Sequence, residues 1–192
     1  MKNLLSLFII LFCFDAMAVG RIDFSYGYYS INSKAEKKTT STSSSDSGNS
    51  ASVSGPYMFN LAYLLPVADK FQLNIGYSVL LADIAGTDKG YGLNVGFNYF
   101  LLGSAKNENL KNDAIDVERF EIWKPYTGIG FYQRDFQSIK NSYAGFGING
   151  GVERYYTKDV SFKGELRYIS LSGANSVIAT EMNAIFGIIF II

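Results

Sequence analysis

Apolar side chains recur at every second position in segment after segment of this chain. In "VSFKGELRYISL", residues 160–171, the charged Lys163, Glu165 and Arg167 alternate with apolar, aromatic or glycine neighbours. A period of two places successive side chains on opposite faces of a β-strand. The pattern predicts eight strands, in "RIDFSYGYYSI", "PYMFNLAYLL", "FQLNIGYSVLL", "YGLNVGFNYF", "KPYTGIGFYQ", "YAGFGINGGVERYY", "VSFKGELRYISL" and "SVIATEMNAIFGIIFII".

The two faces of these strands differ in a way that argues against a soluble sheet. One face is dense in Phe, Tyr, Leu and Ile, whereas the other carries Gly, Asn, Ser, Gln and charges and cannot fill a soluble core. Strands cross a membrane only as a closed barrel, with the apolar face toward lipid. The sequence therefore predicts an all-β fold, an eight-stranded antiparallel up-and-down transmembrane β-barrel. A secreted soluble sandwich or lipocalin-like barrel is the weaker alternative.

The N-terminus, "MKNLLSLFIILFCFDAMA", has the features of a secretory signal. Lys2 precedes an apolar run that ends at Phe14, and a small-x-small site ends at Ala18. We expect cleavage after Ala18, which leaves residues 19–192 as the barrel domain. A retained anchor is disfavoured because the run has about half of the roughly 20 residues that a membrane helix needs.

Composition argues against several classes of function. Lys plus Arg (17) equals Asp plus Glu (17), so no net field attracts nucleic acid. The chain has no histidine, and its one cysteine, Cys13, lies in the predicted signal, where Phe12 disfavours a lipoprotein site. Thiol chemistry and a histidine-based triad are therefore not expected in the mature chain, nor is a cofactor or transition metal. Calcium at acidic outer loops stays open.

The segment "GFGING" matches the dinucleotide motif G-x-G-x-x-G at Gly145, Gly147 and Gly150. That motif needs a following helix, whose N-terminus binds the phosphates, and no helical pattern follows. We interpret these glycines as positions where a barrel strand curves.

The connections between strands fall into two sets if the N-terminus starts on the periplasmic side. "PVADK" (66–70) and "TKD" (157–159) fit short periplasmic turns, whereas residues 102–119 are a long periplasmic connection or an extension of the fifth strand. The Ser- and Thr-rich residues 33–54 predict a flexible extracellular loop. The other outer loops are expected near 82–89, 134–141 and 172–176.

Charges on the polar face predict a network inside the barrel, formed by Arg21, Asp23, Glu153, Lys163, Glu165, Arg167 and Glu181. These residues lie on the first, sixth, seventh and eighth predicted strands, which are contiguous in a closed barrel. Two hypotheses stay open: the charges satisfy one another as a structural plug, which we favour, or they form a gate that opens by exchanging partners. Aromatic residues near strand ends predict an interfacial girdle, formed by Tyr63, Tyr99, Trp123, Tyr155 and Tyr156.

Turn geometry predicts the partners of some of these charges. A three-residue "TKD" turn places Glu153 opposite Lys163, and a loop centred on Ala174 places Arg167 opposite Glu181. Glu165 then has no charged residue opposite, so its partner is expected on its own strand face or across the lumen.

The chain resembles the small outer-membrane β-barrel family that includes the OmpA membrane domain, OmpX and Ail. The resemblance rests on "KPYTGIGFY" (124–132), "GFGINGGVERYYTKDVSFKGELRYISL" (145–171) and the last strand. In that strand Gly187, Phe190 and Ile192 have the spacing of the signal that the barrel-assembly machinery recognises, although the last residue is usually Phe.

The resemblance implies the outer membrane of a Gram-negative cell envelope, with outer-membrane lipid, lipopolysaccharide and the barrel-assembly machinery as partners. We expect a monomeric, non-enzymatic, OmpA-like or porin-like barrel with a structural or surface-interaction role, and an unidentified ligand at the 33–54 loop. A narrow channel for small or hydrophobic solutes is the alternative, and a membrane enzyme is the third.

Overall fold

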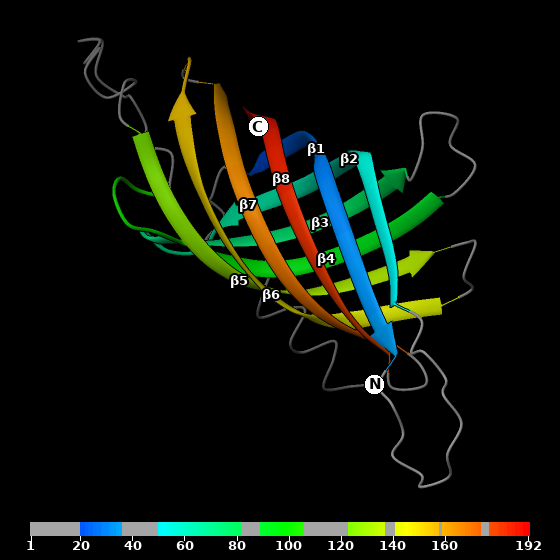
Figure 1. Ribbon diagram of the computed structural model, residues 1–192. Coiled ribbons are helices and arrows are strands. Elements are labelled where there is room, and N and C mark those ends of the chain that lie inside the picture. Colours follow the sequence, from blue (N-terminus) through cyan, green and yellow to red (C-terminus); the bar gives the residue numbers. More distant parts are fainter. Residues whose placement is uncertain are drawn as a thin grey trace, which may run out of the picture.

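The chain folds into one closed antiparallel barrel of eight strands, which confirms the predicted fold class (Figure 1). The computed structural model describes residues 20–35, 50–81, 89–105, 123–136, 141–157, 159–173 and 177–192. The strands are β1 (Arg21–Ala35), β2 (Ser50–Pro66), β3 (Phe71–Leu81), β4 (Lys89–Phe100), β5 (Trp123–Phe136), β6 (Asn141–Tyr155), β7 (Val160–Gly173) and β8 (Val177–Ile191).

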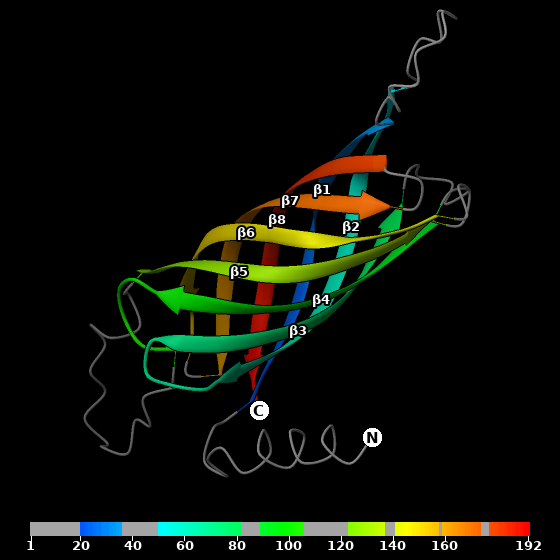
Figure 2. The same cartoon turned by 90° about the horizontal axis from the view of Figure 1, so that it is seen from below.

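Pairing of the first strand with the last closes the barrel. The β1–β8 ladder runs from Arg21 opposite Ile191 to Ala35 opposite Val177, so neither strand is a free edge. In Figure 2 the strands of the front wall, β3 to β5, cross those of the back wall, β1 and β8, as expected for strands that are inclined in a closed barrel.

Two short turns, Gly20 and Ile192 lie at one end of the barrel, which we call the turn end. The amide of Ile192 donates to the carbonyl of Gly20 (2.9 Å), and the amide of Ile191 donates to Asp159 (3.0 Å). The β6–β7 turn closes where the amide of Tyr156 donates to the carbonyl of Val160 (2.9 Å), as the "TKD" turn predicts. We call the opposite end the far end.

Side-chain alternation is inverted relative to a soluble protein. On β7, outward Leu166 is 67% exposed, whereas its inward neighbour Arg167 is 3% exposed. Exposed large apolar side chains lie on the outer face of every strand, and the buried charged and amide side chains face the lumen, which is the arrangement expected in lipid. None of the described residues forms a helix that is long and apolar enough to cross a membrane.

Several predicted loop boundaries are wrong because strand pairing continues beyond the apolar pattern. β1 reaches Ala35 and β2 begins at Ser50, so the 33–54 loop is shorter than predicted at both ends; polar residues there still pair through backbone hydrogen bonds, as Lys34 does with Ser50. The predicted loop at 134–141 loses residues to β5 and β6. The predicted signal (1–18), the centre of the first loop and residues 106–122 lie outside the described residues.

The chain that leaves β4 turns back under the barrel at the turn end. Gly103 has a φ of 74°, in the left-handed region that suits glycine. The Ser104 hydroxyl donates to the Asp69 carboxylate (2.6 Å), and the Lys124 ammonium donates to the Ser104 carbonyl (3.1 Å). Ala105 is fully buried, in one apolar cluster with the inward-facing Phe100 and Tyr126. These contacts cover part of the lumen at this end.

The lumen wall formed by β2 to β6 is lined with amide and hydroxyl side chains. They are buried, and each of them forms at least one hydrogen bond to another side chain of this wall. Hydrogen bonds of 2.9–3.4 Å join Ser78 to Asn60, Asn94 to Asn74, Asn98 to Gln72 and Asn149 to Asn98.

Gly128 leaves the space that this amide wall needs. A Cβ on Gly128 would lie 2.3 Å from Asn98 Oδ1 and 2.5 Å from the Phe97 carbonyl oxygen. Gly128→Ala should therefore destabilise the barrel by about 1–3 kcal/mol. Unfolding by urea in lipid vesicles, followed by the fluorescence of Trp123, measures this free energy. The matched control is Gly150→Ala on the outer face, where the nearest atom would be 4.0 Å away; equal losses for both variants would contradict the crowding.

Candidate functional site: the charged lumen

All seven charges predicted for the lumen lie inside the barrel, and none is more than 6% exposed. Alternation explains this, because the odd-numbered residues of β6, β7 and β8 and of the first half of β1 face inward. The structure adds two buried cations on β5: Arg134, which is fully buried and joins these seven, and Lys124, which lies apart at the turn end and donates to the Ser104 carbonyl. We call this set the lumen charges: Arg21, Asp23, Arg134, Glu153, Lys163, Glu165, Arg167 and Glu181.

Arg21 and Glu153 form an ion pair across the lumen near the turn end. The pair joins β1 to β6, which are not neighbours in the barrel. The Ser161 hydroxyl also donates to Glu153 Oε1 (3.0 Å). The Tyr155 ring lies beside the guanidinium of Arg21 (5.8 Å from Cζ to the ring centroid) and beside Lys124 (4.5 Å from Nζ). The prediction of Tyr155 as a girdle residue is therefore wrong; it shares the inward parity of Glu153.

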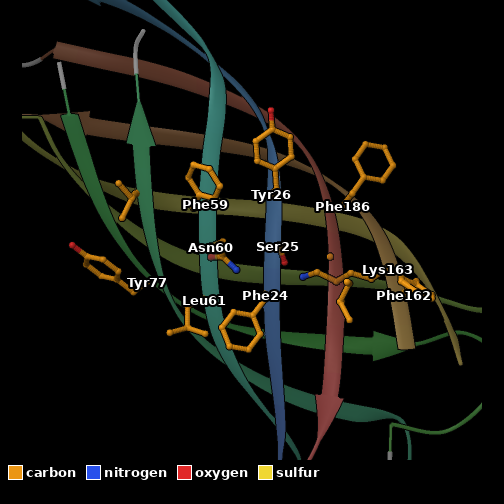
Figure 3. Close-up of a pocket in the computed structure, with 13 residues that line it drawn as sticks. Phe24, Ser25, Tyr26, Phe59, Asn60, Leu61, Tyr77, Phe162, Lys163 and Phe186 are labelled. Carbon is orange, nitrogen blue, oxygen red and sulfur yellow. The ribbon is translucent and has the colours of Figure 1, made fainter. Parts of the chain in front are cut away.

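Lys163 crosses behind β8 to reach Asp23 on β1. Its ammonium pairs with the Asp23 carboxylate, which also accepts a hydrogen bond from Ser25. Figure 3 shows the Lys163 side chain passing β8 and pointing toward Ser25. Gly187 on β8 makes this path available, because a Cβ there would lie 2.6 Å from Ser25 Oγ and 3.1 Å from Lys163 Cε.

Glu165 takes its partners from its own strand and from across the lumen, as expected. Its carboxylate pairs with Arg167 and lies 3.7 Å from Lys163 Nζ, both on β7. The Tyr126 hydroxyl on β5 donates to Glu165 Oε2 (2.6 Å). This hydrogen bond links β5 to β7, which are separated in the barrel wall by β6.

Arg134 and Glu181 form a two-pronged ion pair in the half of the lumen nearer the far end. Arg134 Nε lies 2.9 Å from Glu181 Oε2, and Nη2 lies 2.9 Å from Oε1. Both side chains are 0% exposed, and Asn183 Nδ2 also donates to Oε1 (2.7 Å). Bidentate Arg–carboxylate pairs are among the stronger charge-assisted hydrogen bonds. This one joins β5 to β8.

The predicted register is confirmed in one hairpin and wrong in the next. Glu153 lies opposite Lys163, as predicted, although each forms its ion pair elsewhere. Arg167 lies opposite Asn183, not Glu181, because the β7–β8 pairing is shifted by two residues. A two-residue shift leaves every side chain on the same face, so alternation alone could not reveal it.

Arg134 is absent from the predicted network because the predicted fifth strand ends at Gln133, whereas β5 continues to Phe136. Alternation continues beyond that point, since Tyr132, Arg134 and Phe136 are all buried on the inward face. The signal was therefore present in the sequence. The sequence does not reveal which carboxylate pairs with Arg134, because that depends on how non-adjacent strands face one another.

The residues of the predicted assembly signal lie at the end of β8. Gly187 lines the lumen beside Lys163, whereas Phe190 faces outward against Phe24 (ring centroids 5.9 Å apart). Ile192 is 63% exposed. Their recognition by the assembly machinery stays a prediction.

The outer face over β7, β8 and β1 to β3 holds an apolar groove of about 570 Å³. Figure 3 shows Phe24, Tyr26, Phe59 and Leu61 projecting from the ribbon around it. Such a surface suits lipid chains. Within the described ranges, no group of three or more His, Cys, Asp or Glu side chains could hold a metal ion.

No protein-family model matches this sequence, and no curated protein is significantly similar to it. Solved structures with the same fold include Neisserial surface protein A (16% identity, 87% of this chain and 96% of that one, TM-score 0.53). The N-terminal β-barrel domain of Pseudomonas aeruginosa OprF matches at 12% identity (92% and 100%, TM-score 0.53). OprG from Pseudomonas aeruginosa matches at 11% (91% and 97%, TM-score 0.52). At this identity the likeness shows the fold alone.

Removing one partner of the Arg134–Glu181 pair should leave an uncompensated buried charge. We expect Arg134→Ala and Glu181→Ala each to lower the free energy of unfolding by about 3–5 kcal/mol. Replacing both residues together, as Arg134→Met with Glu181→Leu, should cost less than either single change. Urea unfolding in vesicles measures all three. The control is Asp135→Asn, an exposed charge on the same strand, which should change stability by no more than about 0.5 kcal/mol. A variant with both residues changed to alanine completes the comparison. If its loss of stability equals the sum of the two single losses, the two residues do not interact and the pair is contradicted.

Proposed function

Because this chain has the fold of the small eight-stranded outer-membrane β-barrels, we propose that it is a non-enzymatic outer-membrane protein with a structural or surface-interaction role. Its membrane-spanning part is a closed barrel that holds the connections at its far end on the cell surface. The observation that carries this proposal is the set of fully buried ion pairs that cross the lumen between non-adjacent strands.

Successive layers of side chains support a closed lumen. At the turn end Ala105, Phe100 and Tyr126 form one buried apolar cluster. The ion pairs occupy the middle, and toward the far end a second apolar cluster fills the lumen. That cluster contains Tyr29, Ile31, Met58, Leu80, Tyr132, Phe136, Tyr143, Ile169, Leu171, Ala179 and Ile185. Eight strands leave an interior that side chains just fill.

The ion pairing of the buried carboxylates supports a non-enzymatic role. Asp23, Glu153, Glu165 and Glu181 each form an ion pair with a buried Arg or Lys, which favours a structural role over that of an acid–base pair. The proposed partners are outer-membrane lipid and lipopolysaccharide around the outer face, and the barrel-assembly machinery at Gly187, Phe190 and Ile192. A surface ligand at the connection between β1 and β2 completes the proposal.

A narrow channel is the second candidate, and one observation favours it. Arg167 pairs through Nε, whereas its Nη1 and Nη2 have no hydrogen-bond acceptor among the described residues, and the same holds for Arg21 Nε and Nη1. Guanidinium groups with spare donors can exchange carboxylate partners, which is what a gate requires.

Conductance in planar lipid bilayers separates the two functions. The closed barrel predicts that the wild-type protein is silent, and that Asp135→Asn is silent too. Glu181→Ala removes the carboxylate that pairs with Arg134 and tests whether this ion pair closes the lumen. Steps of conductance in this variant alone would support a lumen closed by the pair. Reproducible unit conductance in the wild-type protein would overturn the structural proposal in favour of the channel.

A further inference from the structure

Arg154 is a cation on the lipid-facing side of the barrel. It occupies an outward position of β6, between the inward Glu153 and Tyr155. Its neighbours in register are Trp123 on β5 and Phe162 on β7, and these side chains are 55% and 46% exposed. Arg154 therefore lies within an apolar outer face, opposite in direction to the lumen charges.

Trp123 positions the Arg154 guanidinium. The Arg154 Cζ atom lies 5.1 Å from the centre of the Trp123 ring, in a cation–π contact. Among the described residues, no carboxylate lies within ion-pair distance of Arg154, whereas Arg21, Arg134, Lys163 and Arg167 each have one. The guanidinium is thus held in place by Trp123, and none of the described residues accepts a hydrogen bond from it.

The depth of this site matches the membrane–water boundary. Arg154 is the second-last residue of β6, next to the turn end. Tyr156, two residues beyond Arg154, is 71% exposed, and its ring lies 5.7 Å from that of Phe162. Trp, Tyr and Arg concentrate where hydrocarbon meets lipid headgroups. The anionic groups available at that depth are the phosphates of membrane lipids.

We infer that Arg154, Trp123 and Tyr156 form a binding site for the phosphate of one glycerophospholipid in the leaflet at the turn end. The planar guanidinium can donate two parallel hydrogen bonds to a phosphate, which an ammonium cannot. Trp123 and Phe162 would contact the first part of the acyl chains. The inference depends on the outer face meeting lipid and is independent of whether the lumen conducts.

Trp123 is the only tryptophan of the chain, so its fluorescence reports on this site directly. The purified barrel in dodecyl maltoside, which contains no phosphate, is titrated with phosphatidylglycerol. We expect saturation at one lipid per barrel, checked by native mass spectrometry. Arg154→Gln should need roughly fivefold more lipid to reach its midpoint, since one basic residue near anionic lipid contributes about that factor. Arg154→Lys should fall between the two.

Lys70→Gln provides the matched control. Lys70 lies in the turn between β2 and β3 at the same end, so this variant removes an equal charge outside the site. It should titrate like the wild-type protein. Comparing midpoints avoids the change in fluorescence intensity that loss of the cation–π contact causes. Faster migration of the unheated sample than of the heated sample on detergent gels confirms that each variant was folded. Equal midpoints for wild type and Arg154→Gln would overturn the site, and an equal response to inorganic phosphate would overturn the lipid as its ligand.

Discussion

Ion pairs that cross the lumen are the interaction on which this barrel depends. Backbone pairing joins each strand only to its two neighbours, whereas Arg21–Glu153 links β1 to β6 and Arg134–Glu181 links β5 to β8. Charges withdrawn from water are tolerated only when they are paired and hydrogen-bonded. The same contacts therefore satisfy the buried charges and set the distance between opposite walls.

The two walls of the lumen differ in how their buried polar side chains find partners. Along β2 to β6, short amide side chains bond to one another close to the wall, and Gly128 provides the space they need. Along β7, β8 and β1, long charged side chains reach inward, and Gly187 leaves a path for Lys163. The contrast with Arg154 is instructive. Inside the lumen Arg21, Arg134, Lys163 and Arg167 each meet a carboxylate of the chain, whereas we infer that Arg154 on the outer face takes its anion from the membrane.

The fold was predictable from sequence, and the partners inside it only in part. Alternation assigns Lys163, Glu165 and Arg167 to the lumen, because a strand has only two faces. It cannot detect the two-residue shift that moved Arg167 from Glu181 to Asn183. Nor can it pair Arg134 with Glu181, because contacts between non-adjacent strands depend on the inclination of all eight strands together.

Solid-state NMR of the barrel in lipid bilayers tests the central claim most directly. With labelled arginine and glutamate, the measurement detects through-space contacts between guanidinium nitrogens and carboxyl carbons. The structure predicts a strong contact between Arg134 and Glu181, whose nitrogen and oxygen atoms approach to 2.9 Å. A guanidinium of Arg134 in contact with lipid phosphate or bulk water, and with no carboxylate, would contradict an inward-facing charge network.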